Sequence, residues 1–292
     1  MVDPGDSSEL YRVILCCVDE DIDIVRAKEE IVKFRVATVV IASAGILLAA
    51  TACSSGGSSN GGASAPAKTT AAAAKTYTAS DLPTILTTAE KKVGLSGKIL
   101  DNAQVQASEK QAQTSGGVQA LLSQKGVTIT PASCATILKN NLSQTPPADS
   151  VNAGLTYGSN LVLLSTISGK KLPTTYTTGA AAQSDKALSE CGSMKISLTE
   201  SGQTVSIPLT LKKISVSTDA DQTRAIEETI TVPSATGGAG KPVSVEIISA
   251  IAGNLAITAE GSSTATTAAS TPSASPTVPL TDVINAVVAA AK

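Results

Sequence analysis

The chain of 292 residues contains no histidine and no tryptophan, and its only aromatic side chains are one Phe and four Tyr. Without histidine, neither a Ser-His-Asp triad nor a Cys-His pair can be assembled, and zinc sites with histidine ligands are excluded as well. The apolar core must therefore consist of Leu, Ile, Val and Ala, each of which stabilises a fold by a small amount.

The chain also has no large excess of positive or negative charge. The chain carries 22 basic and 24 acidic residues, so its formal net charge is −2. No basic patch interleaved with aromatic residues is found, and such a patch is the usual electrostatic footprint of a nucleic-acid-binding surface. The composition therefore argues against nucleic acid as a partner.

Catalytic motifs are either missing or incomplete. The chain has no Walker A loop and no G-x-G-x-x-G loop. Ser168-Gly-Lys-Lys171 matches the Ser-x-x-Lys pattern of penicillin-binding enzymes, but no Lys-Thr-Gly or Ser-Asp-Asn follows it. Glu227 and Glu228 are adjacent on an expected strand and so face opposite sides, which favours a solvated edge over a catalytic pair. The sequence predicts a protein that is not an enzyme and that takes no cofactor and no metal.

One apolar run stands out near the N-terminus. Residues 36–50 are apolar over about fifteen positions behind Lys33 and Arg35, which fits a secretory signal and is too short for a spanning helix. The run leads into Ala50-Thr51-Ala52-Cys53, which resembles the lipobox of bacterial lipoproteins, although Leu is more frequent than Ala at position 50.

The lipobox resemblance implies that Cys53 is lipidated and becomes the first mature residue. Several acyl chains on one cysteine anchor a protein stably, whereas a single chain is marginal. We therefore expect the protein to be held at the cell membrane through Cys53, on the extracytoplasmic face. The alternatives are an ordinary signal peptide cleaved at the same small residues and an uncleaved anchor helix.

The residues before the signal do not fit an export sequence. Residues 1–52 carry nine acids and five bases, a net charge of −4, which is the wrong sign for the start of a signal peptide. The codons of Lys28-Glu29-Glu30 can spell a ribosome-binding sequence upstream of a start at Val32. Our hypothesis is that residues 1–31 are a misread upstream region and that residues 32–52 are the signal peptide; the alternative is a genuine cytosolic extension.

Two cysteines, Cys134 and Cys191, remain in the exported part of the chain. Exported proteins keep cysteines mainly in pairs, so the sequence predicts a Cys134–Cys191 disulfide. Two free or metal-binding thiols are the competing interpretation, but no histidine and no third cysteine lies nearby.

The exported chain divides into a tether and one domain. Residues 53–77 are rich in Ser, Gly and Ala and predict a disordered tether. Residues 78–292 predict a single domain, with a low-complexity Ser/Thr/Pro loop at 261–279. Helices are expected at 78–93, 133–142, 178–191 and 281–291, and strands at 151–157, 161–167, 194–198, 205–211, 225–232, 243–251 and 255–258.

The strands alternate apolar residues with Ser, Thr, Glu and Lys. This pattern predicts an antiparallel sheet covered by helices, hence an α+β fold with one disulfide. The C-terminal helix is expected to pack on the sheet, with a frayed tail as the alternative. Residues 98–117 are polar and predict a loop or an edge segment, and residues 118–122 fit a short helix or a strand equally well. Pro208 predicts an edge-compatible position.

Three short motifs carry a wider resemblance: Pro131-Ala-Ser-Cys134, Leu188-Ser-Glu-Cys191 and Ile251-Ala-Gly-Asn254. Over residues 78–290 the chain resembles the extracellular sensor domains of certain mycobacterial serine/threonine kinases and related mycobacterial lipoproteins. Those sensor domains often hold two disulfides, whereas one can form here. The resemblance implies a ligand-binding or sensing module with a cleft and identifies no ligand-binding residue.

Two functions remain open from the sequence. The first is an envelope lipoprotein that binds or senses a lipid or small hydrophobic ligand between sheet and helices. The second is a structural or accessory protein that docks an envelope protein partner and binds nothing small. A deep apolar pocket would favour the first, and a filled interior with an exposed apolar patch would favour the second.

Overall fold

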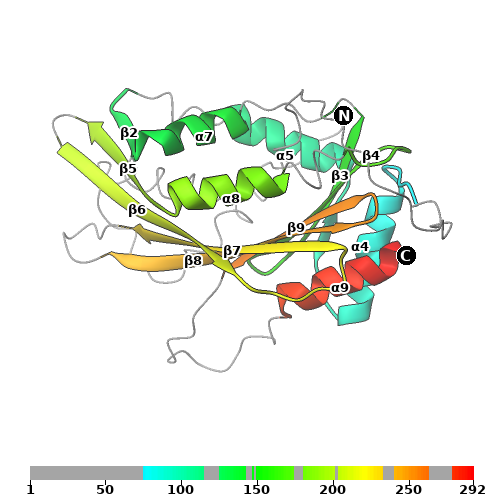
Figure 1. Cartoon of the computed structure of the whole chain (residues 1–292). Coiled ribbons are helices and arrows are strands. Elements are labelled where there is room, and N and C mark those ends of the chain that lie inside the picture. The colour runs from blue at the N-terminus through cyan, green and yellow to red at the C-terminus, as the bar shows by residue number, and fades with distance from the viewer. Residues whose placement is uncertain are drawn as a thin grey trace, which may run out of the picture.

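The computed structural model describes residues 75–114, 125–142, 147, 149–173, 180–200, 203–232, 240–262 and 278–292 (Figure 1). Cys53 and residues 1–52 lie outside the described residues, as do most of the predicted tether, residues 118–122 and most of the predicted loop at 261–279. Within the described parts of the chain, no helix is long and apolar enough to cross a membrane.

A single nine-stranded antiparallel sheet forms the centre of the domain, with the order β1-β3-β4-β9-β8-β7-β6-β5-β2. The strands are β1 (Lys98–Leu100), β2 (Val127–Thr130), β3 (Ser150–Tyr157), β4 (Asn160–Ile167), β5 (Ser193–Glu200), β6 (Gln203–Ile214), β7 (Gln222–Val232), β8 (Lys241–Ala252) and β9 (Leu255–Ser262). The predicted α+β fold with an antiparallel sheet is confirmed.

Helices cover both sides of this sheet (Figure 1). They are α4 (Asp81–Val93), α5 (Asn102–Thr114), α7 (Ala132–Leu142), α8 (Ala180–Cys191) and α9 (Leu280–Ala291). Helices α4 and α9 pack on one side, which we call the α9 face, and α5, α7 and α8 lie on the other, the α8 face.

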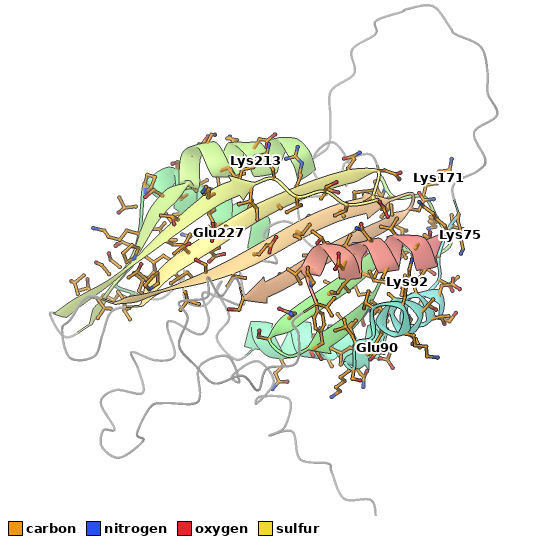
Figure 2. The ribbon with its side chains drawn as sticks, turned by 90° about the horizontal axis from the view of Figure 1, so that it is seen from below. Lys75, Glu90, Lys92, Lys171, Lys213 and Glu227 are labelled. Atoms are coloured by element: carbon orange, nitrogen blue, oxygen red, sulfur yellow. A yellow bond between two sulfur atoms is a disulfide. The ribbon has the colours of Figure 1, made fainter. Side chains whose placement is uncertain are left out.

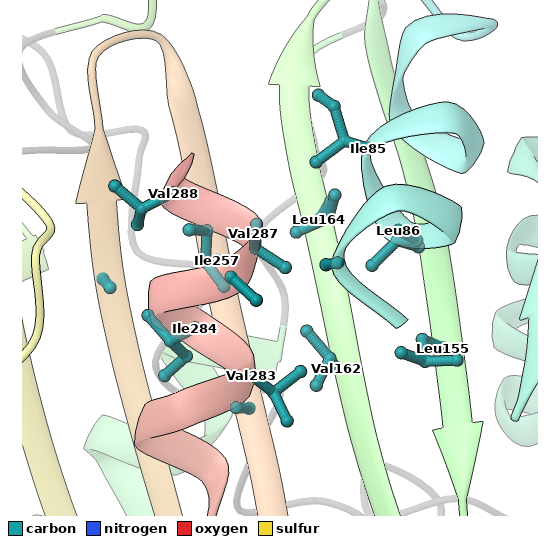
Figure 3. Close-up of a cluster of buried hydrophobic side chains, with 14 of the residues drawn as sticks. Ile85, Leu86, Leu155, Val162, Leu164, Ile257, Val283, Ile284, Val287 and Val288 are labelled. Carbon is teal, nitrogen blue, oxygen red and sulfur yellow. The ribbon is translucent and has the colours of Figure 1, made fainter. Parts of the chain in front are cut away.

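The main hydrophobic core lies on the α9 face (Figure 3). Val283, Ile284 and Val287 recur on one side of α9 at helical spacing and are fully buried. They pack over the central strands in a cluster that includes Val162 of β4 and Ile257 of β9. The C-terminal helix therefore packs on the sheet, as the sequence predicts.

The start of the domain is fastened to its end. The Tyr77 hydroxyl and the Lys75 ammonium donate hydrogen bonds to the carbonyl of Ala291, at 3.0 and 3.2 Å. The Asn254 side chain donates to the carbonyl of Lys75 at 2.9 Å. Figure 2 shows Lys75 at the end of the molecule where α9 finishes. Lys75 and Tyr77 are thus held beside the C-terminus.

The expectation of a loop or an edge segment at residues 98–117 holds only for β1, which is an edge strand, because Asn102–Thr114 form helix α5 instead. The helix begins with a reciprocal cap: the Gln104 amide donates to the Asp101 carboxylate, and the Asp101 amide donates to the Gln104 side chain. Such a capping box satisfies two of the amides that a helix start leaves without partners. Ala, Gln, Glu and Lys favour the helical state even without an apolar stripe.

The predicted disulfide is confirmed, since Cys134 and Cys191 are bonded with their Cα atoms 5.4 Å apart. Cys134 lies in the first turn of α7 and Cys191 ends α8. Both side chains are buried in a second apolar cluster with Ile129, Met194 and Ile196. The bond therefore joins the two helices on the α8 face, where α7 packs on β2 and α8 on β6.

Pro208 lies on an interior strand, yet its position suits a proline. It opposes Lys195 of β5, while the ladder between β6 and β7 begins only at Leu209. The missing amide of Pro208 therefore precedes the β7 ladder.

Candidate ligand-binding face of the sheet

The two faces of the central strands differ sharply in chemistry. On the α9 face, β4, β8 and β9 present six aliphatic side chains of negligible exposure, Val162, Leu164, Ile248, Ala250, Ile257 and Ala259, together with the polar Asn160, Thr166 and Glu246. On the α8 face, the same strands present a half-buried and chemically mixed set, which we call the central band: Leu161, Leu163, Ser249, Ile251, Thr258 and Glu260.

Strand register brings the central band together from distant parts of the chain. Leu161 of β4 opposes Glu260 of β9, and Glu260 opposes Ile247 of β8. Thr258 likewise lies between Leu163 and Ser249. Directly opposed residues of antiparallel strands share a face, so acid, hydroxyl and apolar groups lie side by side on one surface.

The helices on the α8 face pack mainly on the outer strands. α5 contacts β1 and β3, α7 contacts β2, and α8 contacts β6. Leu188 of α8 also reaches Ile226 and Ile247. Among the described elements, no helix makes extensive contact with β4, β8 or β9 on this face. The central band is therefore only half-buried, although it lies in the middle of the sheet.

Glu228 is the least expected residue on this face. Its side chain is only 1% exposed, and neither carboxyl oxygen has a hydrogen-bond partner among the described residues. It lies on β7 between Leu211 and Val245 of the neighbouring strands. The expectation of a solvated edge is thus wrong for Glu228, because β7 is an interior strand and this side of it is covered.

Glu260 and Glu228 form an acidic pair across β8. Burial, and secondarily the charge of Glu260, raise the pKa of Glu228 to about 8. Burial raises the pKa of Glu260 to about 7. Within the described part of the chain neither carboxylate has an ion pair, because the nearby Arg224 and Lys213 both contact Asp185 of α8.

Within the described part of the chain, two further unpartnered hydroxyls lie on the same face, and a third, that of Tyr157, lies on the α9 face. The hydroxyls of Ser249 on β8 and Ser150 on β3 are buried without a hydrogen-bond partner among the described residues. A buried polar group without a partner costs about 1–3 kcal/mol, so such groups are uncommon in a plain core. The α8 face can therefore offer hydrogen bonds and negative charge to a bound molecule.

Sequence reasoning named three site residues and missed this face. Cys134 and Cys191 are bonded as predicted, and Cys53 lies outside the described residues. No group of three or more Cys, Asp or Glu side chains that could hold a metal occurs among the described residues. The signal for Glu228 was present in the sequence, because Ile226 and Ile230 place it within an apolar stripe of period two.

No protein-family model and no curated protein matches the chain. One similar solved structure is an uncharacterized protein from Mycobacterium smegmatis, described as an Rv0999 ortholog. It is 16% identical, with 57% of this chain and 77% of that chain covered and a TM-score of 0.30. A likeness this weak carries no argument about fold or function, so the resemblance to mycobacterial kinase sensor domains remains a prediction.

Proposed function

We propose that the protein is a membrane-anchored cell-envelope lipoprotein whose extracytoplasmic domain binds or senses a ligand without catalysing a reaction. The observation that supports this function is the contrast between the two faces of the same strands. One face is a largely aliphatic core, while the other carries the half-buried central band and Glu228, which has no hydrogen-bond partner among the described residues.

A purely structural role does not account for this contrast. On the α9 face the buried hydroxyl of Thr166 on β4 has a partner, since it donates a hydrogen bond to the carbonyl of Asn254 at 2.7 Å. Unpartnered carboxyl and hydroxyl oxygens lower stability, and a protein tolerates them most readily where they serve a site. The mixture of apolar and polar groups on the central band is also typical of small-molecule sites.

The anchor and the sensor-like character complete the proposal. Cys53 follows an apolar signal and precedes a segment that leads to Lys75. Lipidation of Cys53 would hold the domain at the outer surface of the cell membrane. The likeness to mycobacterial sensor domains and lipoproteins, which rests on the cysteine motifs, belongs to the same proposal.

A native mass spectrum tests ligand binding. We would export residues 54–292 from an actinobacterial host and purify the protein in oxidised form. We expect a species heavier than the polypeptide that loses a small molecule on activation. Leu163→Arg places a charge in the central band and should abolish this species, whereas Val243→Arg alters an exposed apolar residue outside the band and should retain it.

A bare monomer for all three proteins would contradict ligand binding. That result would favour the second function, a protein that docks an envelope partner. An adduct retained by Leu163→Arg would show that the ligand binds elsewhere.

A further inference from the structure

We propose that the ligand of the central band is a primary amine joined to an apolar portion, with Glu260 as its direct acceptor and Glu228 as a second negative group behind it. This inference rests on the proposed function and names the chemical class of its ligand. It stands on the position of the two acids, on the lack of hydrogen-bond partners for Glu228 within the described part of the chain, and on the side chains around the two acids.

The geometry places two acids close together on one face. Glu228 on β7 opposes Val245, and Glu260 on β9 opposes Ile247, two residues along the same strand β8. Adjacent strands are about 4.8 Å apart, so β7 and β9 are separated by about 10 Å. The negative charge of Glu260 contributes, after burial, to the raised pKa of Glu228. The ionisation of Glu228 therefore depends on that of Glu260, and a bound cation would favour the ionised form of both acids.

The two acids differ in access. Glu260 is half-buried in the central band, whereas Glu228 is closed off from solvent. A ligand can thus contact Glu260 directly. Its charge would interact with Glu228 electrostatically through the low dielectric of the interior. Among the described residues, no hydrogen-bond donor reaches the oxygens of Glu228.

Charged groups on the neighbouring elements already have partners. Those that flank the pair on the α8 face are Lys213 of β6, Arg224 of β7, and Asp185, Lys186 and Glu190 of α8. Asp185 contacts both Arg224 and Lys213, at 3.1 and 3.9 Å. Lys186 faces Glu190 at 3.9 Å. None of the ion pairs found among the described residues involves Glu228 or Glu260, so a cationic ligand would supply the countercharge that their ionisation requires.

Two other cation classes fit less well. A metal ion needs several ligand side chains, and no such group of three is present among the described residues. A quaternary ammonium ion is recognised by aromatic faces. The described tyrosines, Tyr77 and Tyr157, both belong to the core of the α9 face. A primary amine needs only hydrogen-bond acceptors, which Glu260 and the Thr258 hydroxyl supply on one strand.

Apolar side chains flank the acid on its accessible side. Leu161 lies directly opposite Glu260, and Leu163 lies opposite Thr258. Both leucines are half-buried, so part of their surface remains to be covered. A ligand with an aliphatic portion would remove this surface from water while its amine contacts Glu260.

The test compares three probes of equal chain length: n-decylamine, n-decanol and decanoate. Binding to exported residues 54–292 is measured by calorimetry at pH 6 and pH 8. We expect decylamine to bind about tenfold more tightly than decanol at pH 8, the size expected of one charge-assisted hydrogen bond. The amine should also bind more tightly at pH 8 than at pH 6, because ionised carboxylates accept it.

Variants locate the contact. Glu260→Gln keeps the shape of the side chain and should weaken decylamine binding about tenfold. Glu246→Gln is the matched control, because Glu246 also lies on β8 at the centre of the sheet but faces the opposite side, against Glu227. Decylamine binding should be unchanged in this control. Thermal unfolding of each variant verifies that it remains folded.

A second measurement needs no variant. Binding a charged amine lowers the pKa of both acids, so protons are released at pH 7. Calorimetry in two buffers of different ionisation heat should therefore show proton release with decylamine and none with decanol. The proposal that the ligand is a primary amine would be overturned if decanol or decanoate bound as tightly as decylamine or more tightly. It would also be overturned if Glu260→Gln bound decylamine as tightly as the wild type does.

The failures are distinguishable. One outcome is a native mass spectrum that shows a ligand whose binding is abolished by Leu163→Arg while decylamine fails these tests. In that case the proposed ligand class is wrong and the proposed binding function stands. If neither a native ligand nor any probe binds, both proposals fall.

Discussion

At the scale of single residues, Glu228 makes stability depend on pH. Its pKa is about 8 in the folded protein, against about 4.5 for an exposed glutamate. An acid whose pKa is raised by folding stabilises the fold below its unfolded pKa, and this contribution is lost as pH rises toward the folded pKa. We therefore expect the free energy of unfolding to fall between pH 5 and pH 8, by an amount on the order of a few kcal/mol.

Glu228→Gln removes this titration and retains the size of the side chain. In urea unfolding, the variant should match the wild type near pH 5 and be more stable at pH 8. A smaller slope should remain, because burial also raises the pKa of Glu260, to about 7. Glu190→Gln, on an exposed position of α8, is the control and should follow the wild-type curve. Parallel curves for Glu228→Gln and the wild type would contradict the buried acid.

Residue burial could be predicted only in part. Alternation in β7 places Glu228 on the same face as Ile226 and Ile230, and this signal is local. Glu260 carries no comparable signal, since its face of β9 also bears Thr258. Its burial and its closeness to Glu228 depend on which strands become neighbours.

At the scale of elements, the disulfide joins α7 to α8 across 57 residues of sequence. In the chain-entropy model, closing a loop of this length stabilises the fold by about 4 kcal/mol. The double variant Cys134→Ala, Cys191→Ala should lose about this amount in urea unfolding. Alanine suits the buried positions better than serine, whose hydroxyl would lack a partner.

The reduced wild type provides the control for the lost cross-link. It should unfold at nearly the same urea concentration as the double variant, because both lack the bond. Hydrogen exchange should show faster exchange in α7 and α8 than in α9, which packs on the other face. An unchanged unfolding midpoint would contradict a stabilising cross-link.

Helix prediction shows what periodicity detects and what it misses. The apolar stripe of α9 is evident in the sequence, and the helix packs as expected. Helix α5 has no such stripe, and its polar residues favour a loop when apolar spacing is the only guide. Its signal is the Asp101-x-x-Gln104 cap, a local hydrogen-bonding pattern that hydrophobic periodicity does not register.

At the scale of the whole molecule, the site depends on long-range pairing. β9 lies between β4 and β8, so residues near position 260 meet residues near position 161. Alternation along one strand identifies its two faces but does not identify its neighbours. Seven of the nine strands and four of the five described helices could therefore be predicted from the sequence, whereas the central band could not.

The anchor is the last feature of the whole molecule to be tested, and Cys53 is the residue on which it depends. Several acyl chains on Cys53 would keep the protein in the membrane fraction, since each buried methylene contributes about 0.8 kcal/mol. We expect the full chain, expressed in an actinobacterial host, to incorporate an alkyne-labelled fatty acid. Cys53→Ser should lose the label and leave the membrane fraction.

The double variant Cys134→Ala, Cys191→Ala is the matched control, because it removes two cysteines and keeps the lipobox. It should remain labelled and membrane-bound. Label retained by Cys53→Ser, or a mature chain that begins elsewhere, would contradict lipidation at this cysteine. Since Lys75 is held against Asn254 and Ala291, an anchor at Cys53 would tether the domain by the end where α9 finishes, at the reach of the intervening 21 residues.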